Sequence, residues 1–480
     1  MNIVYRVIGI MVLLAAATLA AGQSDASLRD ASRPDLLSCS PAPCVLSPTQ
    51  ASEGGEEVTD TPIAADPLNL LHLLLGSVDS NCPRPSSSGF HLSANGGTNW
   101  SRICLPVIDS YQGRTFYPGG QPMVGYDLTG TAYIADEYGD SEGLGYGLIA
   151  ISKSTDGVNW SQPIVVASLG FSELLYASMV IDTSPTSPYA NSVYVSSVIL
   201  GEPMQSQTQV AVSQSRNGGA TWVTTMVDSQ QAYPAEDDYT RAATSSDGTV
   251  YVTWQHCESS GPQAGCQDSK AYMLFSKSDD GGMTWADPIP AATVSLNNSA
   301  CHCGIGDLPN TNDVRLYDYP AVGADKTSGP YAGTIYVAVH NWNGTHLEVQ
   351  VVHSTDDGNT WSKPILIAPT NDTHDQFFPS LSVSPGGLVG VSWLDRRNDP
   401  NNVNYQAFAA ISSDGGRSFQ PNVQLTTKFS NPNNNGGPGN RWMGDYTGNT
   451  WDGPNYFITA WMDSSNGVDM QEEVSGIRLK

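Results

Sequence analysis

Arginine, aspartate and tyrosine recur together at several points of this sequence, and side chains of these types could recognise and cleave an acidic sugar. Only 21 of the 480 residues are lysine or arginine. A guanidinium group can bind a carboxylate or sulfate through two parallel hydrogen bonds, and a neighbouring carboxyl group can act as acid or base on a glycosidic bond. The candidate substrate-binding residues are Arg241, Arg315, Arg396, Arg397 and Arg441. The candidate catalytic residues are Asp238, Asp318, Asp395 and Tyr446.

The same residue types also allow a structural role. Each arginine could pair with a neighbouring aspartate and connect adjacent parts of the fold, because structural ion pairs also cluster. Likewise, Asp445 and Tyr446 could simply begin a β-strand. The two interpretations differ in whether the arginines face a common cleft, which depends on the elements that carry them.

A short motif, Ser-x-Asp-x-Gly-x-Thr-Trp, recurs along the chain and locates these elements. In the motif, the Ser and Asp side chains can cap backbone N–H groups, Gly accepts a positive φ, and the aromatic ring packs inward. It therefore predicts a structural β-hairpin without a catalytic role. Two copies match at every position, and four are variants: Ser278 to Trp285 and Ser354 to Trp361, then Ser93 to Trp100, Ser154 to Trp160, Ser215 to Trp222 and Ser412 to Phe419.

A second element recurs with similar spacing and extends the count to seven. Its copies lie at 62–66, 122–127, 178–182, 240–245, 320–325, 379–384 and 443–448, each before a run of β-forming residues. This pattern predicts an all-β fold, a β-propeller of seven four-stranded antiparallel blades. Six blades is the alternative, if the first or last repeat is only part of a blade. The last repeat ends at Lys480 without a hairpin motif, so its outer strand is either absent or comes from the chain before Thr61.

Six such hairpins, called Asp boxes, resemble those of the sialidase (neuraminidase) superfamily, also known as the BNR-repeat proteins. The resemblance covers nearly everything from Thr61 to Lys480. In that family the active-site loops lie on the face opposite the hairpins, which implies that the candidate residues share one face. The resemblance implies an exo-acting glycoside hydrolase on extracellular acidic glycans or, alternatively, a non-catalytic propeller that binds glycan or protein. The Arg-Ile-Pro segment of true sialidases does not occur in the sequence; Arg102-Ile103-Cys104 falls on an expected outer strand.

The N-terminal region divides into two segments before the propeller. Residues 1–22 combine Arg6, an apolar run from Val7 to Leu19 and small residues that suit signal peptidase, which predicts a signal peptide. Residues 23–58 are rich in Ser, Pro, Ala and Glu with little apolar periodicity, which predicts a linker or pro-segment. The propeller is expected at 59–480.

The amino-acid composition makes some classes of binding partner unfavourable. The net charge of -26 disfavours binding to nucleic acid and anionic lipid, and no segment after the signal peptide is apolar enough to span a membrane. We therefore expect a secreted, extracellular, monomeric protein that binds an extracellular glycan or glycoprotein, with no nucleic acid partner and no membrane insertion.

The cysteines predict disulfides. Their number is eight, and in an oxidising compartment an even number favours disulfides over metal ligands. Proximity suggests the pairs Cys39–Cys44, Cys82–Cys104 and Cys257–Cys266. Cys301-His302-Cys303 is ambiguous because its histidine could bind metal, although a disulfide is favoured.

No cofactor is expected, with one open possibility. Acidic loops such as Asp136 to Glu142 could hold Ca²⁺ through oxygen ligands, and the alternative is a solvated acidic loop.

Overall fold

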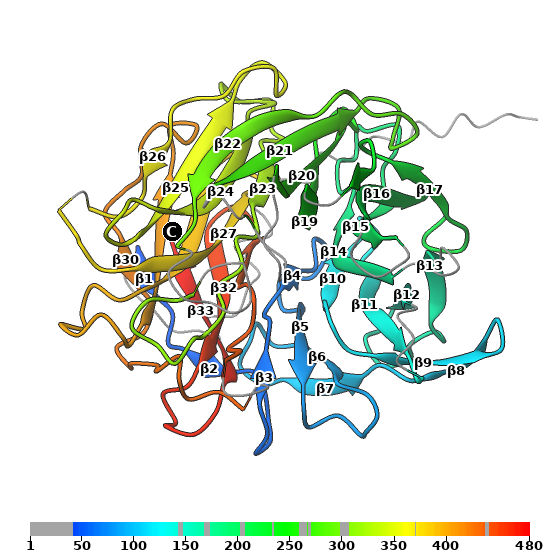
Figure 1. Ribbon diagram of the computed structural model, residues 1–480, viewed down its shortest axis with the longest axis horizontal. Coiled ribbons are helices and arrows are strands. Elements are labelled where there is room, and N and C mark those ends of the chain that lie inside the picture. The colour runs from blue at the N-terminus through cyan, green and yellow to red at the C-terminus, as the bar shows by residue number, and fades with distance from the viewer. Residues whose placement is uncertain are drawn as a thin grey trace, which may run out of the picture.

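The described residues of the computed structural model form seven antiparallel sheets around a central axis (Figure 1). The structure describes residues 42–142, 147–167, 173–201, 207–232, 235–258, 266, 270–297, 307–369, 371–436 and 441–480. Strands β1 to β33 account for all the regular structure in these ranges, in which no helix occurs. The predicted all-β propeller with seven blades is therefore confirmed, and the alternative count of six is wrong.

Each blade is a four-stranded meander that runs outward from the axis. The innermost strands are β4 (Ile63–Ala65), β10 (Met123–Tyr126), β14 (Glu173–Ile181), β19 (Glu236–Thr244), β23 (Ala321–Ala324), β27 (Gln376–Val383) and β31 (Gly448–Asp452). The second strands are β5 (Leu73–Asp79), β11 (Ala132–Asp140), β15 (Val193–Leu200), β20 (Val250–Cys257), β24 (Ile335–Trp342), β28 (Val389–Asp395) and β32 (Tyr456–Asp463).

The third and fourth strands complete the blades. The third strands are β6 (Ser88–Ser93), β12 (Gly147–Ser154), β16 (Gln207–Ser215), β21 (Lys270–Ser278), β25 (Leu347–Ser354), β29 (Gln406–Ser412) and β33 (Gln471–Arg478). The outer strands of the first six blades are β7 (Ser101–Cys104), β13 (Ile164–Ala167), β17 (Val223–Met226), β22 (Ile289–Ser295), β26 (Ile365–Leu366) and β30 (Val423–Gln424). Short strands extend three sheets: β3 (Val58–Thr59) beside β5, β9 (Arg114–Pro118) beside β11 with β8 (Ile108–Tyr111) beside β9, and β18 (Gln231–Ala232) beside β16.

The six sequence motifs form hairpins between the third and fourth strands, and we call them the motif hairpins. In the fourth blade, Ser278 Oγ accepts a hydrogen bond from the Gly282 N–H at 2.8 Å, and Asp280 Oδ1 accepts one from the Thr284 N–H at 2.9 Å. Gly282 has a φ of 88°, which is accessible to glycine at little cost. These local bonds fix the turn, so the motif has the structural role that the sequence predicts.

The aromatic residue of each motif hairpin packs into a different hydrophobic cluster between neighbouring blades. Strands beside these clusters are buried on both faces, as in β32, which explains their near-continuous apolar sequences. The rings in question are Trp100, Trp160, Trp222, Trp285, Trp361 and Phe419. The sequence repeat is thus a spatial repeat.

The ring closes between the two ends of the chain. Strands β1 (Cys44–Val45) and β2 (Thr49–Gln50) pair with β33, so the N-terminal region supplies the outer strands of the seventh blade (Figure 1). The expected linker at 23–58 is therefore too long, because the propeller already begins near Cys44. Leu46 and Ala51 are each 1% exposed in this blade. Two isolated apolar residues give no periodic pattern, which is why the segment reads as a linker. The expected signal peptide at 1–22 lies outside the described residues.

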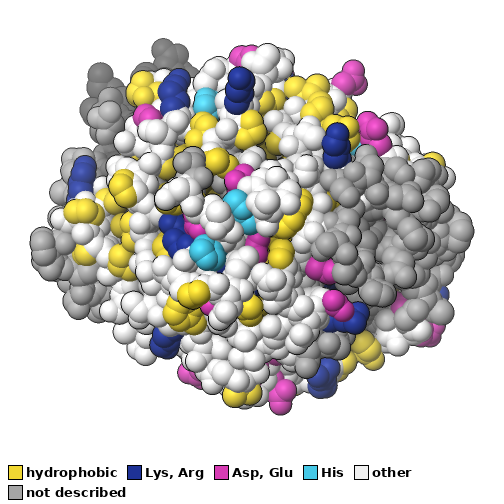
Figure 2. Space-filling view, turned by 60° about the vertical axis from the view of Figure 1, so that its left-hand side comes forward, with side chains coloured by type: hydrophobic (Ala, Val, Ile, Leu, Met, Phe, Trp, Pro, Cys, Tyr) yellow, Lys and Arg dark blue, Asp and Glu magenta, His cyan; other side chains and the backbone are white. Residues whose placement is uncertain are grey.

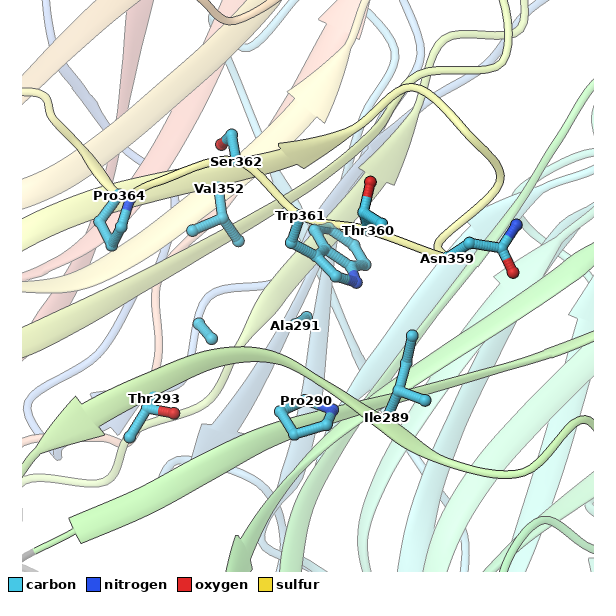
Figure 3. Close-up of a pocket in the computed structure, with 11 residues that line it drawn as sticks. Ile289, Pro290, Ala291, Thr293, Val352, Asn359, Thr360, Trp361, Ser362 and Pro364 are labelled. Atoms are coloured by element: carbon cyan, nitrogen blue, oxygen red, sulfur yellow. The ribbon is translucent and has the colours of Figure 1, made fainter.

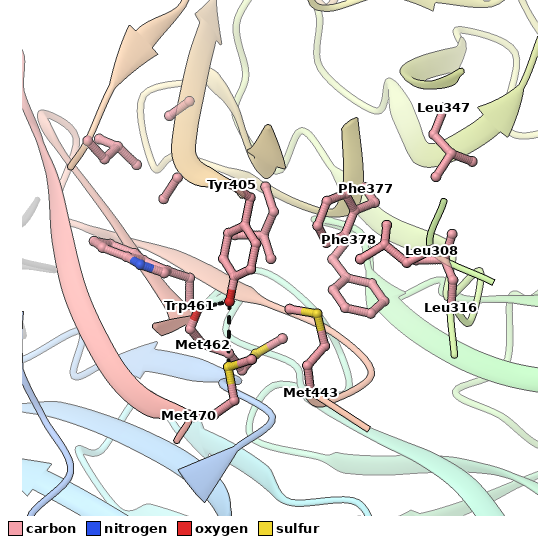
Figure 4. Packing of buried hydrophobic residues seen from close by; sticks show 14 of the residues in the cluster. Leu308, Leu316, Leu347, Phe377, Phe378, Tyr405, Met443, Trp461, Met462 and Met470 are labelled. Atoms are coloured by element: carbon pink, nitrogen blue, oxygen red, sulfur yellow. Dashed lines mark hydrogen bonds between the residues drawn. The ribbon is translucent and has the colours of Figure 1, made fainter. Parts of the chain in front are cut away.

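The seam between the sixth and seventh blades has no motif hairpin, and large side chains fill it instead. Phe377, Tyr405, Trp461 and Met470 belong to one buried cluster there (Figure 4). The Tyr405 hydroxyl donates to the Met462 carbonyl oxygen at 2.8 Å. A specific packing contact thus joins the last two blades.

Two of the predicted disulfides are confirmed. Cys82 bonds to Cys104 with their Cα atoms 5.7 Å apart, and Cys257 bonds to Cys266 with a Cα separation of 5.0 Å. The other expected pairings involve Cys39, Cys301 and Cys303, which lie outside the described residues and stay predictions.

A buried charge network links the first blade to the last strand. His91 Nδ1 lies 2.8 Å from Glu472, its Nε2 lies 3.5 Å from Asp79, and Arg102 Nε lies 2.6 Å from Asp79. Burial lowers the pKa of His91, but Glu472 and Asp79 outweigh it and raise that pKa to about 9. The histidine is therefore charged at neutral pH and ties β6 to β33.

The position of Leu46 provides a test of ring closure. Leu46→Ala should reduce the free energy of unfolding by about 2 to 5 kcal/mol, because it removes a buried side chain from the seventh blade. The matched control is Leu68→Ala, since Leu68 is 54% exposed and its truncation should change stability by about 0.5 kcal/mol or less. Chemical denaturation measures both. Equal, small effects would mean that residues 44–51 are a linker after all.

The His91 network predicts how stability depends on pH. Because the folded-state pKa of His91 lies above the ordinary 6.5, its charge stabilises the fold fully below pH 6.5, and this contribution is lost as the pH rises through about 9. Burial raises the pKa of Glu472 to about 7, which acts in the same direction. The melting temperature should therefore fall from pH 6.5 to 9.

His91→Gln should flatten this dependence and, because it leaves the buried Glu472 carboxyl group without its charged partner, cost about 3 to 5 kcal/mol at neutral pH. Calorimetry across the pH range would measure both effects, with His374→Gln at a partly exposed histidine as the control. A wild-type slope in His91→Gln would contradict the assignment.

Candidate functional site

The innermost strands of several blades share one irregularity near the end where they enter the sheet, opposite the motif hairpins. The register shifts between Leu175 and Ser178 in β14 and between Asp238 and Arg241 in β19. Inside these bulges, Tyr176 and Tyr239 have φ values of 55° and 57°. Positive φ is costly for a bulky residue and is typical of functional or tightly constrained positions. We call this end of the propeller the mouth.

Five tyrosines from four neighbouring regions meet at the mouth, and we call them the tyrosine cluster: Tyr176, Tyr239, Tyr317, Tyr319 and Tyr446. Tyr239 lies at the centre, with ring centroids 4.7 Å from Tyr176, 4.9 Å from Tyr317 and 4.7 Å from Tyr319. Tyr319 continues the contact to Tyr446 at 5.2 Å. The cluster gives the mouth a rigid aromatic floor.

Arg241 is inserted into this floor. Its guanidinium carbon lies 4.3 Å from the Tyr319 ring centroid and 4.4 Å from that of Tyr446, and because these centroids are 5.2 Å apart, both rings lie toward the same side of the group. Nη1 donates to the Thr240 carbonyl oxygen at 3.0 Å. Within the described part of the chain, no carboxylate forms an ion pair with Arg241.

Arg315 is held at the mouth by a two-pronged pair with Asp445. Nε and Nη2 donate to the two carboxylate oxygens at 3.1 Å and 2.9 Å. The rings of Tyr317 and Trp442 lie 4.6 Å and 5.2 Å from the guanidinium carbon, and the indole N–H of Trp442 also donates to Asp445 at 2.9 Å. The Arg315 side chain remains 30% exposed.

A second carboxyl group, Asp60, lies behind Asp445 and accepts a hydrogen bond from its backbone N–H at 2.6 Å. Burial raises the pKa of Asp60 well above its ordinary value, and the charge of Asp445 raises it further. Burial also raises the pKa of Asp445, whereas Arg315 lowers it. We infer that the proton resides on Asp60 and that Asp445 is the ionised partner of Arg315.

The other predicted arginines have their own partners. Arg396 is completely buried, 3.1 Å from Asp375, so it is corrected from a substrate-binding to a structural residue. Arg397 forms an ion pair with Asp395 at 2.6 Å, within the sixth blade. Arg441 forms an exposed pair with Asp313 at 3.2 Å. Four of the five arginines thus pair with an aspartate, as the structural interpretation expects, and Arg241 is the exception. Arg315 and Arg441 nevertheless lie at the mouth with Arg241.

Two of the four candidate catalytic residues, Asp395 and Tyr446, are held by hydrogen bonds to neighbouring groups. Asp395 is occupied by Arg397 and by the indole N–H of Trp393 at 2.7 Å. The Tyr446 hydroxyl donates to the Pro122 carbonyl oxygen at 3.1 Å, and burial raises its pKa well above the ordinary value. Neither group is prepared for nucleophilic attack.

Asp318 and Asp238 are buried carboxyl groups. Asp318 faces His340 at 3.5 Å; burial raises the pKa of Asp318 and lowers that of His340 to about 3, so the pair is neutral. Asp238 lies at the bulge of β19 and is 3% exposed. Burial raises its pKa well above the ordinary value, and Glu236 and Asp237 raise it further. Asp238 is therefore a neutral acid beside the tyrosine cluster.

The expected acidic loop at Asp136 to Glu142 is mostly strand. Residues up to Asp140 belong to β11, and the buried Asp136 carboxyl group accepts hydrogen bonds from Ser88 and from the N–H groups of Gln121 and Glu137. Asp136 is committed to the fold, and Ca²⁺ binding stays a prediction.

Two cavities of the described residues lie in different places. One, about 580 Å³, separates β22 from the fifth motif hairpin beside Trp361 (Figure 3), and no ionisable side chain lines it. The other, about 270 Å³, lies on the axis and includes Arg241 and Tyr446. Two of the candidate residues thus line the axial cavity.

Trp442, Tyr317 and Asp60 are site residues that the sequence analysis did not single out. One signal could have found the aromatic floor: an aromatic residue lies within the innermost strand or two positions before it in five of the seven repeats, namely Tyr176, Tyr239, Tyr319, Phe378 and Tyr446. Asp60 carries no such signal, because it is one acidic residue in a polar segment.

Comparisons with known proteins find matches among solved structures. No protein-family model matches the sequence, and no curated protein matches it. A protein of unknown function from Dyadobacter fermentans is 14% identical, with a TM-score of 0.47, over 76% of this chain and 95% of that chain. A Hadza microbial sialidase is 14% identical, with a TM-score of 0.46, over 82% and 73%. A Penicillium chrysogenum alpha-L-arabinanase complexed with arabinobiose is 13% identical, with a TM-score of 0.46, over 75% and 92%.

The fold is established by the chain's own geometry. Seven four-stranded sheets surround one axis, and six hairpins of the Asp-box sequence join their third and fourth strands. With these features, the chain has the fold of a seven-bladed β-propeller, as its sequence predicts.

Proposed function

We propose that the protein is an extracellular glycan-binding propeller that recognises anionic glycans at its mouth. The proposed surface consists of Arg315, Tyr317, Arg441 and Trp442, and we call it the mouth platform. The two segments that carry it lie side by side, because the Arg315 N–H donates to the Arg441 carbonyl oxygen at 2.9 Å.

The observation that carries the proposal is the environment of Arg315. Asp445 fixes Nε and Nη2, which leaves Nη1 without a hydrogen-bond partner among the described residues. Tyr317 and Trp442 flank the same group. An oriented guanidinium group between aromatic rings can donate to an acidic sugar while the rings cover its apolar face.

Arg441 offers a second cation at the rim of the platform. Its side chain is 46% exposed, and its partner Asp313 is 42% exposed. Exposed ion pairs contribute only about 0 to 1 kcal/mol. A ligand carboxylate or sulfate could therefore replace Asp313 at little cost.

Binding is favoured over hydrolysis because most candidate catalysts are engaged elsewhere. Asp395 holds Arg397, Tyr446 is bonded to the backbone, and Asp318 is buried against His340. A glycoside hydrolase remains the second candidate for one reason. Burial raises the pKa of Tyr317, and Asp445 and Asp238 raise it further, so an ionised and a neutral carboxyl group both lie near this ring. Such a pair can supply a base and an acid.

Because the protein carries a net negative charge, it can bind an anionic ligand only through a few positive side chains at one site. On the face in Figure 2, Lys and Arg side chains are scattered rather than gathered in one basic patch. None of the described residues forms a helix that could cross a membrane, and the two disulfides are compatible with an extracellular location. Nucleic acid is disfavoured by the net charge of -26.

The mouth platform predicts a specific mutational pattern. Trp442→Ala should weaken binding of sialylated or sulfated glycans at least about tenfold, or about 1.4 kcal/mol. Arg441→Ala should weaken it less and reduce its salt dependence, because Arg441 is at the rim. A glycan array identifies the ligand, and titration calorimetry measures the change. Arg417→Ala, at an exposed arginine of the sixth motif hairpin, is the control and should bind normally. Normal binding by Trp442→Ala would overturn the platform.

The same ligands distinguish binding from hydrolysis. We expect no released sugar when the protein is incubated with bound glycans and with fluorogenic sialosides, followed by mass spectrometry. Turnover that Asp238→Asn abolishes while binding persists would instead establish the glycoside hydrolase.

A further inference from the structure

The cavity on the propeller axis has a composition unlike that of the mouth platform. It has a volume of about 270 Å³ and is lined by residues from six of the seven innermost segments. Among the described residues that line it, Arg241 is the one cation, and no carboxylate takes part. In a protein with a net charge of -26, this is an isolated positive site.

The Arg241 guanidinium group has unused hydrogen-bonding capacity. Its one described hydrogen bond joins Nη1 to the Thr240 carbonyl oxygen, so Nε and Nη2 have no partner among the described residues. Asp445 is close enough for Arg241 to lower its pKa, but Arg315 already binds both of its oxygens. The unpaired N–H groups therefore require water or a ligand.

The two tyrosine rings restrict how a ligand can approach. Tyr319 and Tyr446 both lie toward one side of the guanidinium group, because their ring centroids are only 5.2 Å apart, so a ligand must approach from elsewhere. An edge with two N–H donors fits two oxygens of one oxyanion. Ser178 and Ser380 also line the cavity and can donate hydroxyl hydrogens.

The size of the cavity selects a small ligand. Sites for drug-sized molecules are about 300 to 1,000 Å³, and the axial cavity is smaller than this range. A sugar chain would not fit, whereas a carboxylate or phosphate ion with a few waters would.

We propose that the axial cavity binds a small oxyanion, a carboxylate or inorganic phosphate, through the unpaired N–H groups of Arg241. The ion joins Ser178, Arg241 and Ser380 of the third, fourth and sixth blades and so stabilises the ring. This site is separate from the mouth platform and does not depend on glycan binding.

Thermal melting and titration calorimetry with sodium phosphate and with sodium acetate would test the site, against sodium chloride at equal ionic strength. We expect at least one oxyanion to raise the melting temperature of the wild-type protein beyond chloride. Phosphate alone would identify a tetrahedral ion as the ligand, and acetate alone a planar carboxylate. Stabilisation by neither would overturn the proposal.

Variants of Arg241 make the assignment specific. Arg241→Gln should weaken the active oxyanion at least about tenfold, and Arg241→Lys should weaken it less, because the ammonium keeps the charge but loses the paired donors. Arg417→Gln removes one positive charge from a motif hairpin and should bind as wild type. Wild-type affinity in Arg241→Gln would place the anion elsewhere.

A measurement on the wild-type protein covers the case in which Arg241→Gln does not fold. Crystals soaked in selenate should give an anomalous scattering peak within hydrogen-bonding distance of Arg241. Peaks confined to the outer surface would overturn the proposal. Glycan binding at the mouth could fail or succeed without changing either result.

Discussion

Closure of the ring is the constraint on which the rest of the structure depends. A propeller without closure would expose the edge of β33 and leave the first blade without a neighbour. Three contacts prevent this: pairing of β1 and β2 with β33, burial of Leu46 and Ala51, and the charge network of His91, Glu472 and Asp79. Burying these charges is costly, so the network contributes mainly by fixing the register of the first blade against β33, and not through charge attraction alone.

Closure also creates the axis at which the chemistry is concentrated. Seven innermost strands converge there, and straight strands would fill the centre with their own side chains. The bulges at Tyr176 and Tyr239, and a similar one beside Phe378, instead turn aromatic rings toward the mouth. The backbone strain at these positions is offset by ring contacts within the tyrosine cluster. The aromatic floor then covers Arg241 and holds Arg315, so the binding chemistry is a consequence of how the strands enter the blades.

The sequence predicts the fold well because its signals are local and repeated. Each motif hairpin is specified within eight residues, and its aromatic residue, such as Trp285 or Trp361, packs into a hydrophobic cluster between neighbouring blades. The N-terminal boundary could not be predicted, because Leu46 is meaningful only beside β33. Residue type and loop position selected Arg241 and Arg315, which lie at the mouth, and whose role in binding stays a prediction. The same criteria selected Arg396, whose burial against Asp375 depends on packing in three dimensions.

The pairing of the arginines decides between the two kinds of function. A hydrolase for acidic sugars needs several guanidinium groups free for the ligand and a carboxyl group exposed to the bond that breaks. Here Asp445 already holds Arg315, Asp395 holds Arg397, and Asp238 is nearly buried. Such pre-paired arginines are rigid, and rigidity lowers the entropic cost of binding without providing a catalyst. Arg241 is the exception, since aromatic rings and not a carboxylate hold it in place. An anionic ligand can therefore supply the negative charge that no carboxylate of the described residues provides to Arg241. The electrostatic attraction is strongest where the surrounding rings exclude most of the water.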